Sequence, residues 1–193
     1  MKENVFVLVQ TAFLAEEIAY TGAELRSHFV REKAGIPWDG VVAFTGACGV
    51  SGSRLVDLED VEEQHEIVAK QMLHFIGEHF QCPLREGNVR LRLFASIVKE
   101  TLEEMSPGVA VTRSGDDLFV NGRKLTVAIC TASPMSLVFH FGVNVNPSGA
   151  PVSAVGLKKF DVEAKQFGLA VLDRYARECE SIERALRKVR GVS

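Results

Sequence analysis

The titratable side chains best placed to do chemistry lie in one stretch, residues 115–146. Asp116 and Asp117 are adjacent carboxylates, Lys124 directly follows a tight turn, and His140 stands inside an expected strand. Aspartates also favour the beginnings of turns, and a hairpin lysine can simply be exposed. His140 lies between two phenylalanines, so strand alternation points it away from both, into a site or into water. The stretch therefore predicts a candidate site rather than a particular reaction.

The element expected to position these groups is a meander of three strands. Asn121-Gly122 is the strongest short-range hairpin signal in a sequence, and aliphatic and β-branched residues dominate on both sides of it. Ser133-Pro134 marks the second turn. The expected strands are residues 118–120, 123–131 and 136–145.

A small-residue segment forms a second candidate. Residues 45–52 contain three glycines, and a glycine-rich loop lets backbone N–H groups approach an anion closely. A loop that merely needs positive φ has the same composition, and no Walker or dinucleotide pattern fits. A loop thiol becomes reactive beside cations, although a lone cysteine is more often just a small residue. The candidate ligand-binding residues here are Thr45, Gly46, Ala47, Cys48 and Gly49.

A metal site is not expected at the histidines of residues 61–80. This segment has a helical apolar stripe and is expected to be the clearest helix, ending at Cys82-Pro83. His74, Glu78 and His79 spell H-x-x-x-E-H, one residue longer than the metal-binding spacing. In a helix His79 would turn about 100° away from Glu78, so surface or cap roles are favoured.

The remaining pattern predicts an α+β protein in which an antiparallel or mixed sheet carries packed helices. Asp161 is a plausible N-cap for the last helix, and Gly35 would end the first. Beside 61–80, helices are expected at 22–33, 89–104 and roughly 162–189. Further strands are expected at 4–10, 41–44, 55–60 and 109–112.

Composition narrows the class of protein. The chain has 193 residues and 21.2 kDa, which fits a single domain over 1–193. A net charge of −3 argues against bulk nucleic-acid binding. No apolar run reaches the roughly 18 residues of a membrane span, and the first residues do not read as a secretory signal. Four scattered cysteines without a CxxC spacing fit reduced thiols in a cytoplasmic protein.

The quoted motifs carry a resemblance. Residues 116–125, followed by Phe141-Gly142-Val143-Asn144-Val145, resemble the catalytic core of biotin and lipoate protein ligases, in which Asp-hydrophobic, Gly-Arg-Lys and Gly-x-Asn-Val segments occur in this order. Over nearly its whole length, the chain resembles a small family of uncharacterised prokaryotic proteins, a domain of unknown function. That family is related in fold to those ligases and to class II aminoacyl-tRNA synthetases.

This resemblance implies roles for individual residues. The ligases join a carboxylate to ATP as an acyl-adenylate, and Lys124 matches the lysine that holds the anionic oxygens. Asp117 matches an aspartate that would hold Mg²⁺ or a ribose beside the nucleotide, and Asp116 replaces the usual asparagine. Residues 45–49 fall where the ligases keep a substrate- and phosphate-binding loop. ATP and Mg²⁺ are the implied cofactors, and a homo-oligomer is compatible with the sequence.

Two departures from the ligase pattern leave two hypotheses open. The ligase loop normally carries arginines, whereas here Arg54 is the nearest one. Ala154 or Val155 stands where related octanoyltransferases place a cysteine. The first hypothesis is a ligase- or acyltransferase-like enzyme that binds a nucleotide or a small carboxylic acid, with Lys124, Asp117 and His140 in its site. The second is a non-catalytic relative that binds or regulates.

Overall fold

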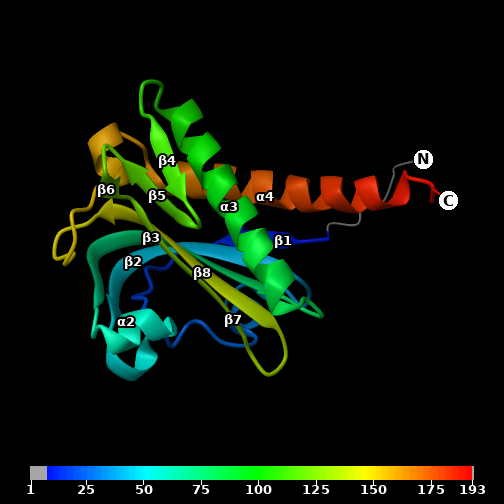
Figure 1. Cartoon of the computed structure of the whole chain (residues 1–193), viewed down its shortest axis with the longest axis horizontal. Coiled ribbons are helices and arrows are strands. Elements are labelled where there is room, and N and C mark those ends of the chain that lie inside the picture. Colours follow the sequence, from blue (N-terminus) through cyan, green and yellow to red (C-terminus); the bar gives the residue numbers. More distant parts are fainter. Residues whose placement is uncertain (1–7, 193) are drawn as a thin grey trace.

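The structure is a computed structural model that describes residues 8–192, and its centre is a five-stranded sheet (Figure 1). The strand order is β1-β2-β3-β8-β7, with β1 parallel to β2 and every other pair antiparallel. The predicted α+β class is confirmed. The strands are β1 Gln10–Phe13, β2 Gly40–Val50, β3 Ile67–His79, β7 Thr126–Ala132 and β8 Leu137–Asn146.

A second, three-stranded sheet holds β4 Val111–Ser114, β5 Asp117–Val120 and β6 Arg123–Lys124. The Asn121-Gly122 hairpin prediction is confirmed, because Phe119 pairs with Lys124 across it. Both turn residues have positive φ, 51° and 71°, as the turn type favoured by Asn-Gly requires. The predicted single meander is nevertheless divided, since β5 and β6 belong to this small sheet and β7 and β8 to the large one.

Two long helices cover one face of the large sheet (Figure 1). They are α3 Leu84–Met105 and α4 Ala164–Arg187, so the predicted helices at 89–104 and 162–189 are confirmed, with α3 starting earlier. Glu163 caps α4 by accepting hydrogen bonds from two backbone N–H groups, which corrects the expected cap. Asp161 instead ends the short 3₁₀ helix η2 Leu157–Phe160, with φ 55°.

Short elements cover the opposite face. The first helix, α1 Phe29–Ala34, is shorter than the predicted 22–33, and Gly35 ends it at φ 69° as expected. Residues 55–60 do not form the predicted strand, because Asp57 caps helix α2 Leu58–Glu62 through the N–H of Glu59. The 3₁₀ turn η1 Gly52–Arg54 precedes it. The predicted strand at 4–10 falls largely outside the described residues.

The largest correction concerns residues 61–80, most of which form the long strand β3 instead of a helix. Every residue from Met72 to His79 is buried. Leu73 and Phe75 pack toward α3 and α4, while Met72 and Ile76 belong to a second core cluster on the other face. A strand covered on both faces is apolar on both, so its sequence loses the alternation that marks a half-exposed strand.

The predicted loop at residues 45–49 is also wrong, because these residues continue β2. The pairing of β2 with β3 shifts between Gly46 and Cys48, where the strand bulges. Residues 18–20 run beside the bulge: the N–H of Ile18 donates to the Thr45 carbonyl at 3.0 Å, and that of Gly49 to the Tyr20 carbonyl at 2.9 Å. The Gly49 N–H, which was expected to face an anion, therefore already donates its hydrogen bond to the neighbouring segment of the same chain.

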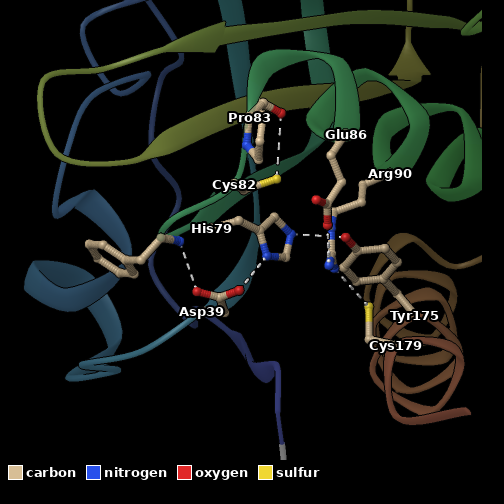
Figure 2. Close-up of polar contacts among 9 residues, drawn as sticks. Asp39, His79, Cys82, Pro83, Glu86, Arg90, Tyr175 and Cys179 are labelled. Carbon is tan, nitrogen blue, oxygen red and sulfur yellow. Dashed lines mark hydrogen bonds and ion pairs between the residues drawn. The ribbon is translucent and has the colours of Figure 1, made fainter. Parts of the chain in front are cut away.

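A buried polar network ties β3 to β2 and α4 (Figure 2). The side chain of Asp39 accepts hydrogen bonds from the Phe80 N–H at 2.8 Å and from His79 Nδ1 at 3.0 Å. The Tyr175 hydroxyl lies 2.9 Å from His79 Nε2. His79 therefore fixes the end of the strand on which His74 stands.

Across residues 8–192, no helix is both long and apolar enough to cross a membrane.

Candidate ligand-binding site

A cavity of about 880 Å³ follows β7 and reaches the small sheet. Its lining brings together side chains from β5, β6, β7 and β8 with residues of α2, of α3 and of the connecting segments around 50–57, 64–68 and 150–154. The cavity thus lies where the two sheets meet. β8, which runs between β3 and β7, contributes His140 and Asn144 to this lining.

Five of the predicted site residues line this cavity, namely Asp116, Asp117, Lys124, His140 and Asn144. The β2 residues are placed differently. Thr45 lines a second cavity of about 700 Å³ beside the start of α4, and Gly46, Ala47, Cys48 and Gly49 line neither. From the end of β2, Val50 is the residue that reaches the first cavity.

Lys124 and Asp117 form an ion pair at the cavity. Lys124 Nζ lies 3.1 Å from Asp117 Oδ2, and each side chain is about one-third exposed. The backbone of Lys124 is held by residues 153–155, donating to the Ser153 carbonyl at 2.9 Å and accepting from the Val155 N–H at 3.0 Å. Burial raises the pKa of Asp117, an effect that the Lys124 ammonium opposes and the carboxylates of Asp116 and Asp60 reinforce.

Two arginines add positive charge to the lining. Arg54 lies in η1, just after β2, and Arg92 comes from α3, where its guanidinium is 3.9 Å from Asp116 Oδ1. The sequence identified Arg54 only as the nearest arginine to the small-residue segment, and it placed Arg92 only within the helix expected at 89–104. Neither position could be assigned to the site from spacing, because both depend on how distant segments pack.

Tyr20, His74 and His140 form a buried aromatic group, of which Tyr20 and His140 line the cavity. Tyr20 and His140 stack with ring centroids 3.7 Å apart and planes at 9°. His140 Nε2 lies 3.0 Å from His74 Nδ1, and His74 Nε2 lies 3.3 Å from the Gly46 carbonyl. The alternation argument left His140 facing a site or water, and it faces the cavity. Tyr20 carried no sequence signal.

Asn144 of β8 is hydrogen-bonded to the backbone at Lys124 and Leu125. Its side-chain amide donates to the Lys124 carbonyl at 3.3 Å, and its backbone N–H donates to the Leu125 carbonyl at 2.9 Å. Asn144 is buried. Its position therefore couples β8 to the hairpin that carries the lysine.

The thiol of Cys48 is not suited to nucleophilic chemistry. It is buried against the Ile67 carbonyl, 3.7 Å away. Burial raises its pKa to about 12, so the reactive thiolate is scarce at neutral pH. Among residues 8–192, no group of three or more His, Cys, Asp and Glu side chains could hold a metal ion.

Solved structures with this arrangement of strands and helices define the fold class. A biotin protein ligase from Aquifex aeolicus in complex with biotin and ATP superposes with a TM-score of 0.60 at 16% identity, over 91% of this chain and 72% of that one. A putative lipoate protein ligase from T. acidophilum with bound lipoic acid gives 0.58 at 11% identity, over 89% and 86%. The fold is that of the biotin and lipoate protein ligases.

The chain belongs to the family described as domain of unknown function DUF366, which matches residues 9–190. An uncharacterized protein of Methanocaldococcus jannaschii is 31% identical over 185 residues, covering 91% of this chain and 82% of the relative. A protein of unknown function from Pyrococcus horikoshi superposes with a TM-score of 0.89 at 32% identity, over 96% and 100%. The predicted family and its relation to the ligases are confirmed.

Proposed function

We propose that this protein binds a nucleotide or a small carboxylic acid in the 880 Å³ cavity, with Lys124 against the anionic oxygen. The observation that carries the proposal is the lysine itself. Its backbone N–H and carbonyl are both hydrogen-bonded to residues 153–155, and its ammonium is partly exposed at the cavity. Pockets of this size suit small ligands. A fixed point charge of this kind stabilises carboxylate or phosphate oxygens.

Arg54 supports an anionic ligand in a lining that also holds the carboxylates of Asp57, Asp60, Glu66, Asp116 and Asp117. Without a ligand, the Lys124 ammonium is balanced by Asp117 at 3.1 Å, whereas Arg54 supplies a second cation from η1. Guanidinium groups bind carboxylates and phosphates through two parallel hydrogen bonds. We propose that Arg54 supplies the arginine that residues 45–49 lack.

The ligase-like fold implies ATP and Mg²⁺. The cavity has no protein-only metal site among the described residues, but Mg²⁺ bound to nucleotide phosphates needs only one or two carboxylates from the protein. Asp117 is the residue that would supply one, with Asp116 beside it in the lining. When bound, ATP would supply the activated phosphate to which a carboxylate ligand could be joined. Lys124 would hold the oxygens that carry the negative charge.

Shared packing supports a single functional unit over the chain. Side chains of the small sheet, including Leu118 and Val120, belong to the same core cluster as Phe94 of α3 and Phe139 of β8. The family match also spans residues 9–190. We therefore treat the chain as one ligand-binding domain in the tests that follow.

A thermal-shift screen with ATP, AMP, biotin, lipoate and amino acids tests the proposal, since a ligand that binds the native state raises its melting temperature. Lys124→Ala should weaken binding of the anionic hit about 10- to 100-fold, because a charge-assisted hydrogen bond contributes roughly 1.5–3 kcal/mol. Pyrophosphate release from ATP in the presence of a carboxylic acid then separates an enzyme from a binding protein.

Lys99→Ala is the matched control. Lys99 pairs with Glu103 at 2.6 Å on α3, with exposures of 30% and 32% that resemble the 31% and 33% of Lys124 and Asp117. Lys99 does not line the cavity. Loss of either exposed pair should cost about 0–1 kcal/mol of stability, and only Lys124→Ala should lose ligand. Equal ligand affinity in both variants would refute the proposal.

A further inference from the structure

The protons on the two histidines of the cavity can be assigned from their partners. A backbone carbonyl only accepts, so His74 Nε2 donates to the Gly46 oxygen at 3.3 Å. A neutral imidazole carries one proton, and His74 Nδ1 is therefore an acceptor. His140 Nε2, 3.0 Å away, must donate to it. His140 Nδ1 is then left with a lone pair.

The neutral state of both rings follows from their surroundings. His74 is fully buried and His140 is 3% exposed. Burial lowers the pKa of His74 to about 4 and holds the pKa of His140 well below its usual value, with His74 lowering it further. Both rings are therefore uncharged at neutral pH, as the chain of donors and acceptors requires.

The lone pair of His140 Nδ1 belongs to a residue that lines the cavity. No residue within 8–192 donates a hydrogen bond to it. In the same part of the chain, His28 Nδ1 is the one buried side-chain nitrogen or oxygen that is sealed from solvent without a partner. His140 Nδ1 is thus unpartnered but not sealed, and its residue lines the cavity.

The His140 ring is held in a fixed plane. Tyr20 stacks flat on it, and Gly142 leaves room on the same face of β8, where a Cβ would come within 3.1 Å of His140 Cε1. Val127 and Ile129 of β7 line the adjoining wall. The acceptor is therefore preorganised within aromatic and aliphatic surroundings.

We propose that this point of the cavity binds a neutral ligand group with an N–H or O–H, such as a lactam, urea or hydroxyl, which donates to His140 Nδ1. The inference deepens the proposed function and rests on it for the other end of the ligand, where Lys124 takes an anion. An anionic oxygen is excluded at His140, because two lone pairs would face each other. The apolar wall favours a neutral donor over an ammonium group, whose desolvation is costly.

Two neutral probes test this point without involving Lys124. They are 2-piperidinone, which carries a lactam N–H, and its N-methyl derivative, which does not. Nitrogen-15 spectra of the histidine rings should show both His74 and His140 protonated at Nε2, and 2-piperidinone should shift the His140 Nδ1 signal. The N–H compound should bind about 3- to 10-fold more tightly than the N-methyl compound, because one neutral hydrogen bond is worth about 0.5–1.5 kcal/mol.

His140→Phe keeps a stacking ring and removes the acceptor, so it should abolish the difference between the two probes. If that variant does not fold, the wild-type spectra and the two wild-type affinities still decide. A proton on His140 Nδ1, equal affinities for the two probes, or no binding of either would overturn the inference. If Lys124→Ala bound anionic ligands as tightly as the wild type, the proposed function would be refuted. The result with the neutral probes would still stand.

Discussion

The buried hydroxyl of Tyr175 gives a prediction whose size can be worked out from the network in Figure 2. Tyr175 and His79 are both fully buried. The Asp39 carboxylate only accepts, so His79 donates to it from Nδ1 across 3.0 Å. The other ring nitrogen of His79, Nε2, forms a hydrogen bond with the Tyr175 hydroxyl at 2.9 Å.

Tyr175→Phe removes this hydroxyl and keeps the ring. The buried His79 Nε2 is left without a partner, which costs about 1–3 kcal/mol of unfolding free energy. The ring of residue 175 stays packed against Phe94 and Phe139, whose ring centroids lie 5.1 and 6.3 Å from that of Tyr175. The loss is thus expected to come from the hydrogen bond alone.

Urea unfolding followed by far-ultraviolet circular dichroism measures the effect, with Tyr20→Phe as the control. Tyr20 is also buried, at 4% exposure, but its hydroxyl has no hydrogen-bond partner among residues 8–192, and its residue lines the cavity. The control should change stability by less than about 0.5 kcal/mol. Equal losses in the two variants, or an unchanged Tyr175→Phe protein, would show that the network does not stabilise the fold as reasoned.

Two further predictions concern β2 and the buried histidines. Gly46→Ala should destabilise by about 3 kcal/mol or more, because its Cβ would lie 1.9 Å from the backbone oxygen of Ile18, whereas Gly49→Ala meets nothing within 4 Å and should be nearly neutral; equal melting temperatures would contradict this. Burial lowers the pKa of His74 from 6.5 to about 4, and that of His140 well below 6.5. The unfolded chain therefore takes up these protons first as pH falls. Stability should be complete above pH 6.5 and should fall toward pH 4 by at most about 1.4 kcal/mol per pH unit for each histidine. Urea midpoints that stay constant or rise between about pH 7 and about pH 5 would refute this sign.

Local chemistry was sufficient where a few neighbouring residues decide the outcome. Asn121-Gly122 fixes a hairpin because both positions tolerate positive φ, so the placement of Lys124 beyond the turn could be predicted. The helix at 89–104 could be predicted because its sequence has an apolar face opposite a charged one. The alternation of His140 with two phenylalanines also assigned its face correctly, since those rings pack under α3.

Burial on two faces hid the rest from the sequence. β3 is covered by α3 and α4 on one side and by residues 18–36 on the other. Its residues are therefore apolar on both faces, and the sequence pattern was interpreted as that of a helix. The small residues of 45–49 look like a loop, but they continue β2, and Gly46 must be a glycine because the backbone of Ile18 lies directly against it. That contact joins segments almost thirty residues apart and leaves no local signal.

The lining of the cavity was decided in the same way. Asp117 and Lys124 belong to one hairpin, and their proximity follows from the sequence. Arg54, Arg92 and Tyr20 reach the same cavity from a turn, a helix and a connecting segment. Their convergence depends on how the two sheets pack against each other. Sequence alone placed the lysine and the aspartate on one hairpin, and the tertiary structure decided which other charges and rings surround them, because only packing brings distant segments within contact distance.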